Sequence, residues 1–180
     1  MAIELVTFFK VLADSDVQHR RLPDRPASAG CGLRDAVAVE RSGVTFNRGF
    51  AATCPLGAAW ALFERHALQP AARRHFGQPV ARVLHLGSYA CRNIGNREGS
   101  RRSEHATGNA IDVSGFVLQD GTRILVAQDW SGREDGRRGA FLKDVRDGAC
   151  RFFHVVLGPD YNAAHRDHFH FDMGRFRACR

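Results

Sequence analysis

Long apolar runs are missing from this chain of 180 residues. No stretch approaches the roughly 20 consecutive apolar residues that a membrane-crossing helix needs, so we expect no integral membrane segment. The 18 glycines and 6 prolines follow no period and form no low-complexity tract, which excludes collagen-like sequences and repeat architectures. Hydrophobic residues make up 44% of the chain and charged residues 25%, a composition typical of one globular domain with a real core.

Closely spaced cysteine pairs are also missing. The five cysteines lie far apart, without a CxxC motif, at Cys31, Cys54, Cys91, Cys150 and Cys179. This spacing disfavours a zinc ribbon or a redox motif and is typical of disulfides in an oxidising compartment. From chain order alone we predict the pairs Cys31–Cys54 and Cys91–Cys150, with Cys179 left over.

A secretion signal is the third absence. The chain begins without a basic n-region or a proper apolar h-region, which conflicts with the oxidising compartment that the cysteines indicate. We follow the cysteines, expect a trimmed or misassigned start, and predict a periplasmic or secreted protein.

Positive charge, by contrast, is abundant. The formal net charge is +7 and the pI about 9.8, with nearly all of the 26 basic residues being arginine. Such a balance favours polyanionic partners, either nucleic acid or an anionic cell-wall polymer. The arginines are scattered, however, and form no basic stripe interleaved with aromatic residues, so we predict a solvated cationic surface and no nucleic-acid partner. The sequence specifies no oligomeric state.

The hydrophobic pattern predicts an α+β fold, in which helices pack against a small antiparallel sheet. Helices are expected over 1–13, 53–77 and 139–153, where Thr53 is the N-cap, Pro70 kinks the second helix and Gly77 ends it. Prolines and Gly30 predict a loop over 23–30. Strands are expected at 36–39, 44–46, 80–86, 110–117, 122–127, 155–157 and 169–173. We assign 1–21 to an N-terminal helix or lead-in segment and 22–180 to the main domain.

Imidazoles and carboxylates gather in two short stretches, 103–112 and 165–170. Side chains alternate between the faces of a strand, so Asp112 can face His170 if the two strands are neighbours. His105 can reach the same point because Gly108 lets the chain turn between His105 and Asp112. A catalytic zinc site takes three such ligands and leaves a fourth position for water, so the pattern points to metal-assisted hydrolysis. The other five histidines (His19, His66, His75, His85, His154) we interpret as structural.

Several motifs carry a resemblance to a known family. The sequence resembles the bacterial extensin-like C-terminal domain family over 22–180. The motifs are Cys54-Pro55-Leu56, Gly87-Ser88-Tyr89-x-Cys91-Arg92, Ser103-Glu104-His105-Ala106-x-Gly108-Asn109-Ala110-Ile111-Asp112, Leu157-Gly158-Pro159-x-Tyr161-Asn162-Ala163-Ala164-His165 and Asp167-His168-Phe169-His170. The central motif with a later His-x-His is also similar to that of zinc peptidases that cut peptidoglycan, a superfamily that includes D-alanyl-D-alanine carboxypeptidases, murein endopeptidases and the hedgehog fold.

The resemblance implies a hedgehog/DD-peptidase-like fold and a set of site residues. Zn²⁺ would be held by His105, Asp112 and His170. His165, His168, Asp167 and Arg92 would serve catalysis, and Ser103 and Arg92 would contact the substrate. Two general bases remain open: His168 shares the strand face of His170, whereas Asp167 needs a bulge or a strand start to reach the site. Ser103 can alternatively cap the local turn.

The implied function is a zinc-dependent peptidase acting on peptidoglycan stem or cross-link peptides, with D,D- or L,D-specificity and in carboxypeptidase or endopeptidase mode. An alternative is a non-catalytic, zinc-containing cell-wall-binding module of the same fold. A metal-dependent nuclease, prompted by the high pI, is the third hypothesis.

Overall fold

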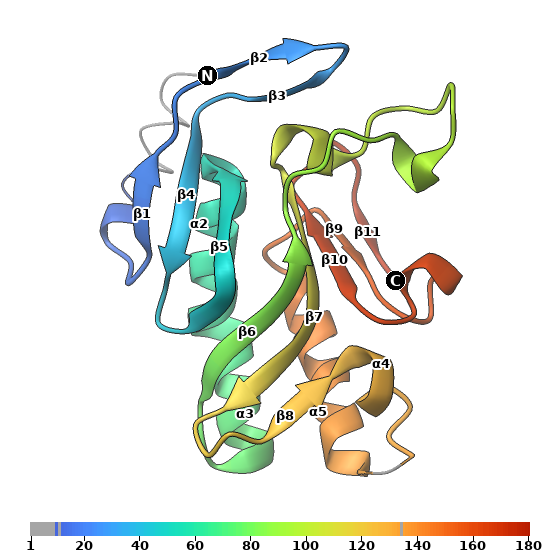
Figure 1. Cartoon of the computed structure of the whole chain (residues 1–180). Helices are drawn as coiled ribbons and strands as arrows, with labels where there is room; N and C mark the ends of the chain where they lie inside the picture. The colour runs from blue at the N-terminus through green and yellow to red at the C-terminus, as the bar shows by residue number, and fades with distance from the viewer. Residues whose placement is uncertain (1–9, 11, 134) are drawn as a thin grey trace.

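The computed structural model describes residues 10, 12–133 and 135–180, without the side chains of 26–28 (Figure 1). The helix expected over 1–13 falls mostly outside these residues. Within it, Lys10, Leu12 and Ala13 are helical, and Leu12 is fully buried against α2. No helix in the described ranges combines the length and apolarity that crossing a membrane requires.

A mixed sheet of nine strands dominates the fold. Its order is β1 (Gln18–Arg21), β4 (Ala36–Arg41), β5 (Thr45–Thr53), β6 (Val80–Gly87), β7 (Ala110–Leu118), β10 (Phe169–Asp172), β9 (Val155–Leu157) and β11 (Ala178–Cys179), with β8 (Arg123–Leu125) paired to β7. Most pairs are antiparallel, but β5 with β6 and β9 with β11 are parallel. The predicted combination of helices with a mostly antiparallel sheet is confirmed, but the sheet is larger than predicted and contains two parallel pairs. Residues 18–21, expected in the lead-in segment, pair with β4.

The helices begin and end largely where local signals place them. α2 (Cys54–Phe63) starts at the N-cap Thr53, whose hydroxyl accepts the N–H of Leu56, and α3 (Gln69–Phe76) ends at Gly77 with φ +70°. Between them, a π-helical turn over Glu64–Leu68 interrupts the helix just before Pro70, as expected of a residue that lacks an N–H. α4 (Val126–Asp129) and α5 (Gly136–Ala149) complete the set.

The helices cover one face of the sheet, behind the strands in Figure 1. Phe169 and Phe171 of β10 point to this side, where Phe171 lies 5.5 Å from Phe63 of α2, centroid to centroid. Since side chains alternate along β10, His170 must point to the opposite face. The sheet thus separates a hydrophobic core from a polar face that carries His170 and Asp112.

Three segments differ from the predicted secondary structure. The loop expected around Pro23, Pro26 and Gly30 is a hairpin of β2 (Arg25–Ser28) and β3 (Cys31–Leu33). The strand expected over 122–127 ends at Leu125, because the buried Asp129 carboxylate accepts the Leu125 N–H and starts α4. The last helix begins three residues earlier than expected, capped by Asp135, and ends at Ala149 rather than 153.

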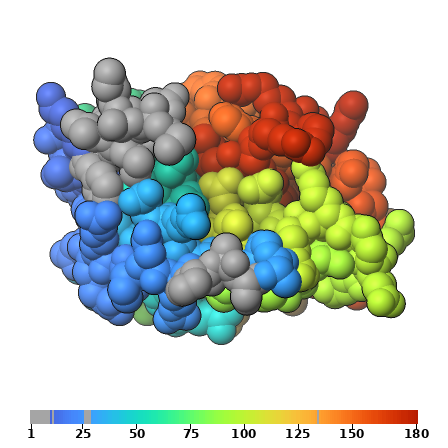
Figure 2. Space-filling view, turned by 90° about the horizontal axis from the view of Figure 1, so that it is seen from above, coloured from blue at the N-terminus to red at the C-terminus, as the bar shows by residue number. Residues whose placement is uncertain are grey.

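The disulfides differ from both predicted pairs. Cys31 bonds Cys91 and Cys150 bonds Cys179, which leaves the buried Cys54 free. Figure 2 shows where residues near 30, in blue, meet the green segment that contains Cys91. Burial and the nearby Asp35 raise the pKa of the Cys54 thiol to about 11, which makes it inert. The two disulfides close loops of 60 and 29 residues. Because each lowers the conformational entropy of the unfolded chain, each contributes about 4 kcal/mol to the free energy of unfolding.

Candidate metal centre

Two neighbouring strands place a carboxylate opposite an imidazole. His170 of β10 pairs directly with Asp112 of β7, so both side chains rise from the same face of the sheet, as their alternation predicted. The Nδ1 atom of His170 lies 2.9 Å from Oδ1 of Asp112. Both residues are only 9% exposed, so the pair is removed from bulk water.

A short helical turn brings the third candidate ligand, His105, to the same point. His105 lies on the 3-10 turn Glu104–Thr107, and its Nε2 atom is 3.1 Å from Asp112 Oδ1 and 3.2 Å from His170 Nδ1. The chain then turns through Gly108, whose φ of +67° favours glycine. A Cβ there would also come within 2.7 Å of Leu33, so glycine serves both the turn and the close approach of β3.

The outer nitrogen of each imidazole has an acceptor of its own. His105 Nδ1 lies 3.1 Å from the Ser88 carbonyl oxygen, which can only accept, so this nitrogen carries the proton. His170 Nε2 lies 2.9 Å from the Asp172 carboxylate and donates in the same way. In the neutral rings, His105 Nε2 and His170 Nδ1 therefore turn lone pairs toward Asp112. Such outer partners commonly fix the tautomer of metal-binding histidines.

Three electron-rich atoms thus meet without a hydrogen atom between them in the neutral state. Within the described ranges, His105, Asp112 and His170 are the one group of His, Cys, Asp or Glu with three ligand atoms within 4.8 Å of one another. Tetrahedral zinc ligands lie roughly 3.3–3.6 Å apart, given bonds of ~2.0–2.2 Å. The observed separations of 2.9–3.2 Å are close to this requirement. The donor set fits a single divalent cation.

Charge within the cluster follows from the same contacts. Burial opposes ionisation of Asp112, but the close imidazoles of His105 and His170 hold the pKa of its carboxyl well below the usual range. Burial likewise disfavours a charged His170, yet its hydrogen bonds to Asp112 and Asp172 raise the pKa of the ring to about 9. Near pH 7 and without a metal ion, His170 is therefore protonated, and its Nδ1 proton lies between the ring and Asp112, where a bound cation would replace it.

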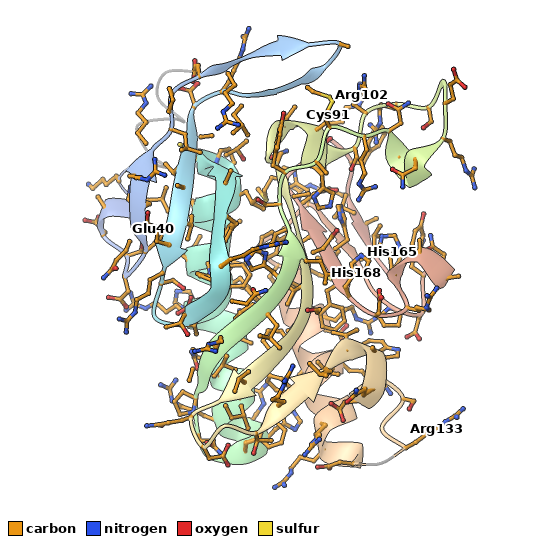
Figure 3. All side chains as sticks on the ribbon, in the orientation of Figure 1. Glu40, Cys91, Arg102, Arg133, His165 and His168 are labelled. Atoms are coloured by element: carbon orange, nitrogen blue, oxygen red, sulfur yellow. A yellow bond between two sulfur atoms is a disulfide. The ribbon has the colours of Figure 1, made fainter. Side chains whose placement is uncertain are left out.

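The two candidate bases form one unit. His168 Nδ1 lies 2.8 Å from Asp167 Oδ1, and His168 Nε2 lies 3.7 Å from Asp112 Oδ1 (Figure 3). Asp167 thus binds the outer nitrogen of His168 and leaves the inner nitrogen facing the cluster. Its own side chain is 50% exposed, against 13% for His168. The hydrogen bond from His168 lowers the pKa of the Asp167 carboxyl.

His165 lies beside this pair. Its ring centroid is 5.3 Å from that of His168 and 5.9 Å from that of His170. Burial, followed by the charges of His170 and His168, lowers the pKa of His165 to about 4, so the ring is neutral near pH 7. Its Nδ1 atom lies 2.8 Å from Oδ1 of Asn162, whose carbonyl accepts the ring proton.

The remaining predicted site residues, Arg92 and Ser103, both contact members of the cluster. Arg92 reaches it, with Nη2 4.0 Å from Asp112 Oδ2. Ser103 is buried and its hydroxyl accepts the N–H of His105, so the capping alternative is observed. Tyr161 is half exposed and packs edge-on against His165, whereas Trp130 packs against Phe169 on the core side.

The five histidines interpreted as structural stay outside the cluster. Their contacts are with Val17 (His19), Phe152 (His66), Asp144 (His75), Arg48 (His85) and Gly174 (His154). The sequence interpretation gave no role to the two outer partners of the imidazoles, the Ser88 carbonyl and Asp172. The alternation His168-x-His170-x-Asp172 places Asp172 on the face of His170 and is its signal in the sequence. A backbone carbonyl such as that of Ser88 leaves no sequence signal.

Comparison with known proteins gives one match. The family model described as Extensin-like protein C-terminus matches residues 9–180, and so includes every residue of the cluster. No curated protein and no solved structure matches this sequence.

Proposed function

We propose that this chain, which belongs to the Extensin-like protein C-terminus family, is a zinc-dependent peptidase acting on the stem or cross-link peptides of peptidoglycan. The observation that carries the proposal is the convergence of His105 Nε2, Asp112 Oδ1 and His170 Nδ1, with both imidazole tautomers fixed from outside. Two histidines and one carboxylate form a typical catalytic zinc set. Motif resemblance to the zinc peptidases of the hedgehog/DD-peptidase superfamily supports the substrate class and a periplasmic or secreted location.

In the proposed reaction, zinc would activate the water and the carbonyl, and the surrounding residues would transfer the proton. When bound, zinc lowers the pKa of water toward ~7 and polarises a carbonyl. His168 takes the proton of the attacking water at Nε2 and delivers it to the leaving amine, while Asp167 holds the proton on Nδ1. This arrangement favours His168 over Asp167 as the general base, because only the histidine faces the cluster.

The charged intermediate needs a cation close to the reacting carbonyl. Arg92 is suited to this role, because its guanidinium lies beside Asp112 and its side chain remains 36% exposed. The ring of the neutral His165 packs against His168 and Tyr161, and because its proton is on Nδ1, its Nε2 can accept a hydrogen bond from the substrate backbone. Ser103 accepts the N–H of His105, and its hydroxyl keeps a proton that it can donate to the substrate.

The proposal predicts one zinc ion per chain and metal-dependent hydrolysis. Incubation with purified muropeptides, followed by mass spectrometry, should show cleaved stem or cross-link peptides. Treatment with EDTA should abolish cleavage, and added zinc should restore it. Metal content measured by plasma mass spectrometry provides the independent readout.

The outcomes also separate the alternatives. A protein that holds one zinc and sediments with purified wall, yet cleaves no muropeptide, would be the non-catalytic wall-binding module. Cleavage of DNA instead of muropeptides would support the nuclease. A protein that takes up no zinc would contradict both zinc-based hypotheses.

A substitution of Asp172 tests whether the outer partner of His170 supports zinc binding. Its carboxylate accepts the His170 Nε2 proton and is itself held by the Gly174 N–H at 2.8 Å. Loss of such a partner typically costs ~10–100-fold in metal affinity, so Asp172→Ala should weaken zinc binding by this factor. Asp172→Asn, which keeps an acceptor oxygen, should lose less. Equal affinity in Asp172→Ala and the wild type would show that Asp172 does not orient His170.

A further inference from the structure

The segment between β6 and His105 makes three contacts with residues of the cluster. The Ser88 carbonyl accepts the His105 Nδ1 proton, and the Ala90 N–H donates to the His105 carbonyl at 3.1 Å. Arg92 reaches Asp112. The segment 88–92 therefore positions one ligand and places a cation beside another.

Little regular structure supports this segment. Between the end of β6 at Gly87 and the turn at Glu104, the described structure contains one short 3-10 helix, Ile94–Asn96, and an isolated bridge between Asn93 and Arg102. The segment is instead tied to the β2–β3 hairpin. Cys91, labelled with Arg102 in Figure 3, is bonded to Cys31, and Arg102 donates to the Ala29 carbonyl at 2.7 Å.

The hairpin in turn packs behind His105. Leu33 of β3 lies against Gly108, the residue that ends the turn bearing His105. Cys31 at the start of β3 is buried at 4% exposure, whereas Cys91 is exposed. The disulfide thus joins the buried strand β3, which packs against the turn that carries His105, to the exposed segment 88–92, which contacts His105 through Ser88 and Ala90. The other disulfide, Cys150–Cys179, joins the end of α5 to β11 and touches none of these contacts.

We propose that the Cys31–Cys91 disulfide is a positioning element of the metal centre, and that opening it weakens metal binding in a chain that stays folded. The inference rests on the proposed zinc site. Reduction by a dithiol breaks the S–S bond, leaves protonated thiols at Cys31 and Cys91, and forms the disulfide of the reductant. Segment 88–92 then loses its covalent link to β3, so the Ser88 carbonyl no longer holds the His105 tautomer.

Two double variants separate positioning from simple stabilisation. Cys31→Ser/Cys91→Ser removes the proposed element, and Cys150→Ser/Cys179→Ser is the matched control, because it removes a disulfide of comparable entropic effect. Zinc affinity is measured by competition with a chromophoric chelator at a temperature where circular dichroism shows each protein folded. We expect the first variant to bind zinc ~10–100-fold more weakly, as for loss of an outer partner, and the control to stay within about twofold of wild type.

Two readouts without metal complete the test. In the apo protein, imidazole ¹⁵N NMR should report a single Nδ1–H tautomer for His105 in the wild type and control, and a mixture in Cys31→Ser/Cys91→Ser. Amide exchange at Ala90 should rise in that variant alone. If the wild type binds no zinc, the proposed function fails, whereas these two readouts still decide whether the disulfide positions His105.

Where the first variant does not fold, the wild type can be titrated with dithiol. Alkylation and mass mapping then give the open fraction of each disulfide, and zinc affinity should fall with the open fraction of Cys31–Cys91. Affinity equal to wild type in both double variants, or equally reduced in both, would overturn the proposal. So would an affinity that follows the opening of Cys150–Cys179.

Discussion

Replacing His170 with alanine should abolish zinc binding and lower muropeptide turnover by ~10³-fold or more. His170 Nδ1 is one of the three proposed ligand atoms. Without it only His105 and Asp112 remain, one protein ligand fewer than a catalytic zinc site needs. A catalytic metal supplies several kcal/mol of transition-state stabilisation, and each 1.36 kcal/mol corresponds to a factor of about ten in rate. Metal content and turnover should fall together.

A matched histidine controls for the loss of a buried contact. His75 also binds a carboxylate, with Nε2 2.7 Å from Asp144, but it lies on α3 away from the cluster. His75→Ala should keep its zinc and its turnover. If His170→Ala retained one zinc per chain, or if His75→Ala lost its metal equally, the assignment of His170 as a ligand would fail.

Replacing His168 with alanine should lower turnover by ~10²–10⁴-fold and leave zinc bound, since general-base catalysis contributes about this much. His168 Nε2 faces Asp112, but at 3.7 Å it stands outside the three-atom group that defines the ligand set. A fall in turnover without a fall in metal content therefore distinguishes a base from a ligand.

Asp167→Ala should have a smaller effect, on the order of tenfold. Asp167 contacts the outer nitrogen of His168 and is half exposed, so water can replace its carboxylate as the acceptor. The two variants together decide the question that the sequence left open. A larger loss of turnover in Asp167→Ala than in His168→Ala would make Asp167 the base.

Local patterns predicted the centre of the fold well. The alternation of β7 and β10 placed Asp112 and His170 on one face, because successive side chains of a strand point to opposite faces and these two strands are neighbours. Thr53 and Gly77 marked the helix ends through capping and a left-handed turn, which depend on a few adjacent residues. The meeting of His105, Asp112 and His170 is predictable for the same reason: each lies at a defined position in a short motif.

Other features depend on contacts that the chain order does not contain. The disulfide partners Cys31 and Cys91 are 60 residues apart, and they meet only because the β2–β3 hairpin lies beside the segment after β6. The parallel pairing of β5 with β6 requires the intervening helices α2 and α3 to return the chain to the same edge. Leu125 ends its strand because Asp129 accepts its N–H, a side-chain bond that overrides the β-propensity of the segment.

A crystal structure of the zinc-loaded protein, with anomalous scattering recorded at the zinc edge, tests the proposed centre most directly. The account predicts one strong anomalous peak bonded at ~2.0–2.2 Å to His105 Nε2, Asp112 Oδ1 and His170 Nδ1, with an open position facing His168. A peak bonded to a different set of residues, or no peak between these three atoms at saturating zinc, would contradict it.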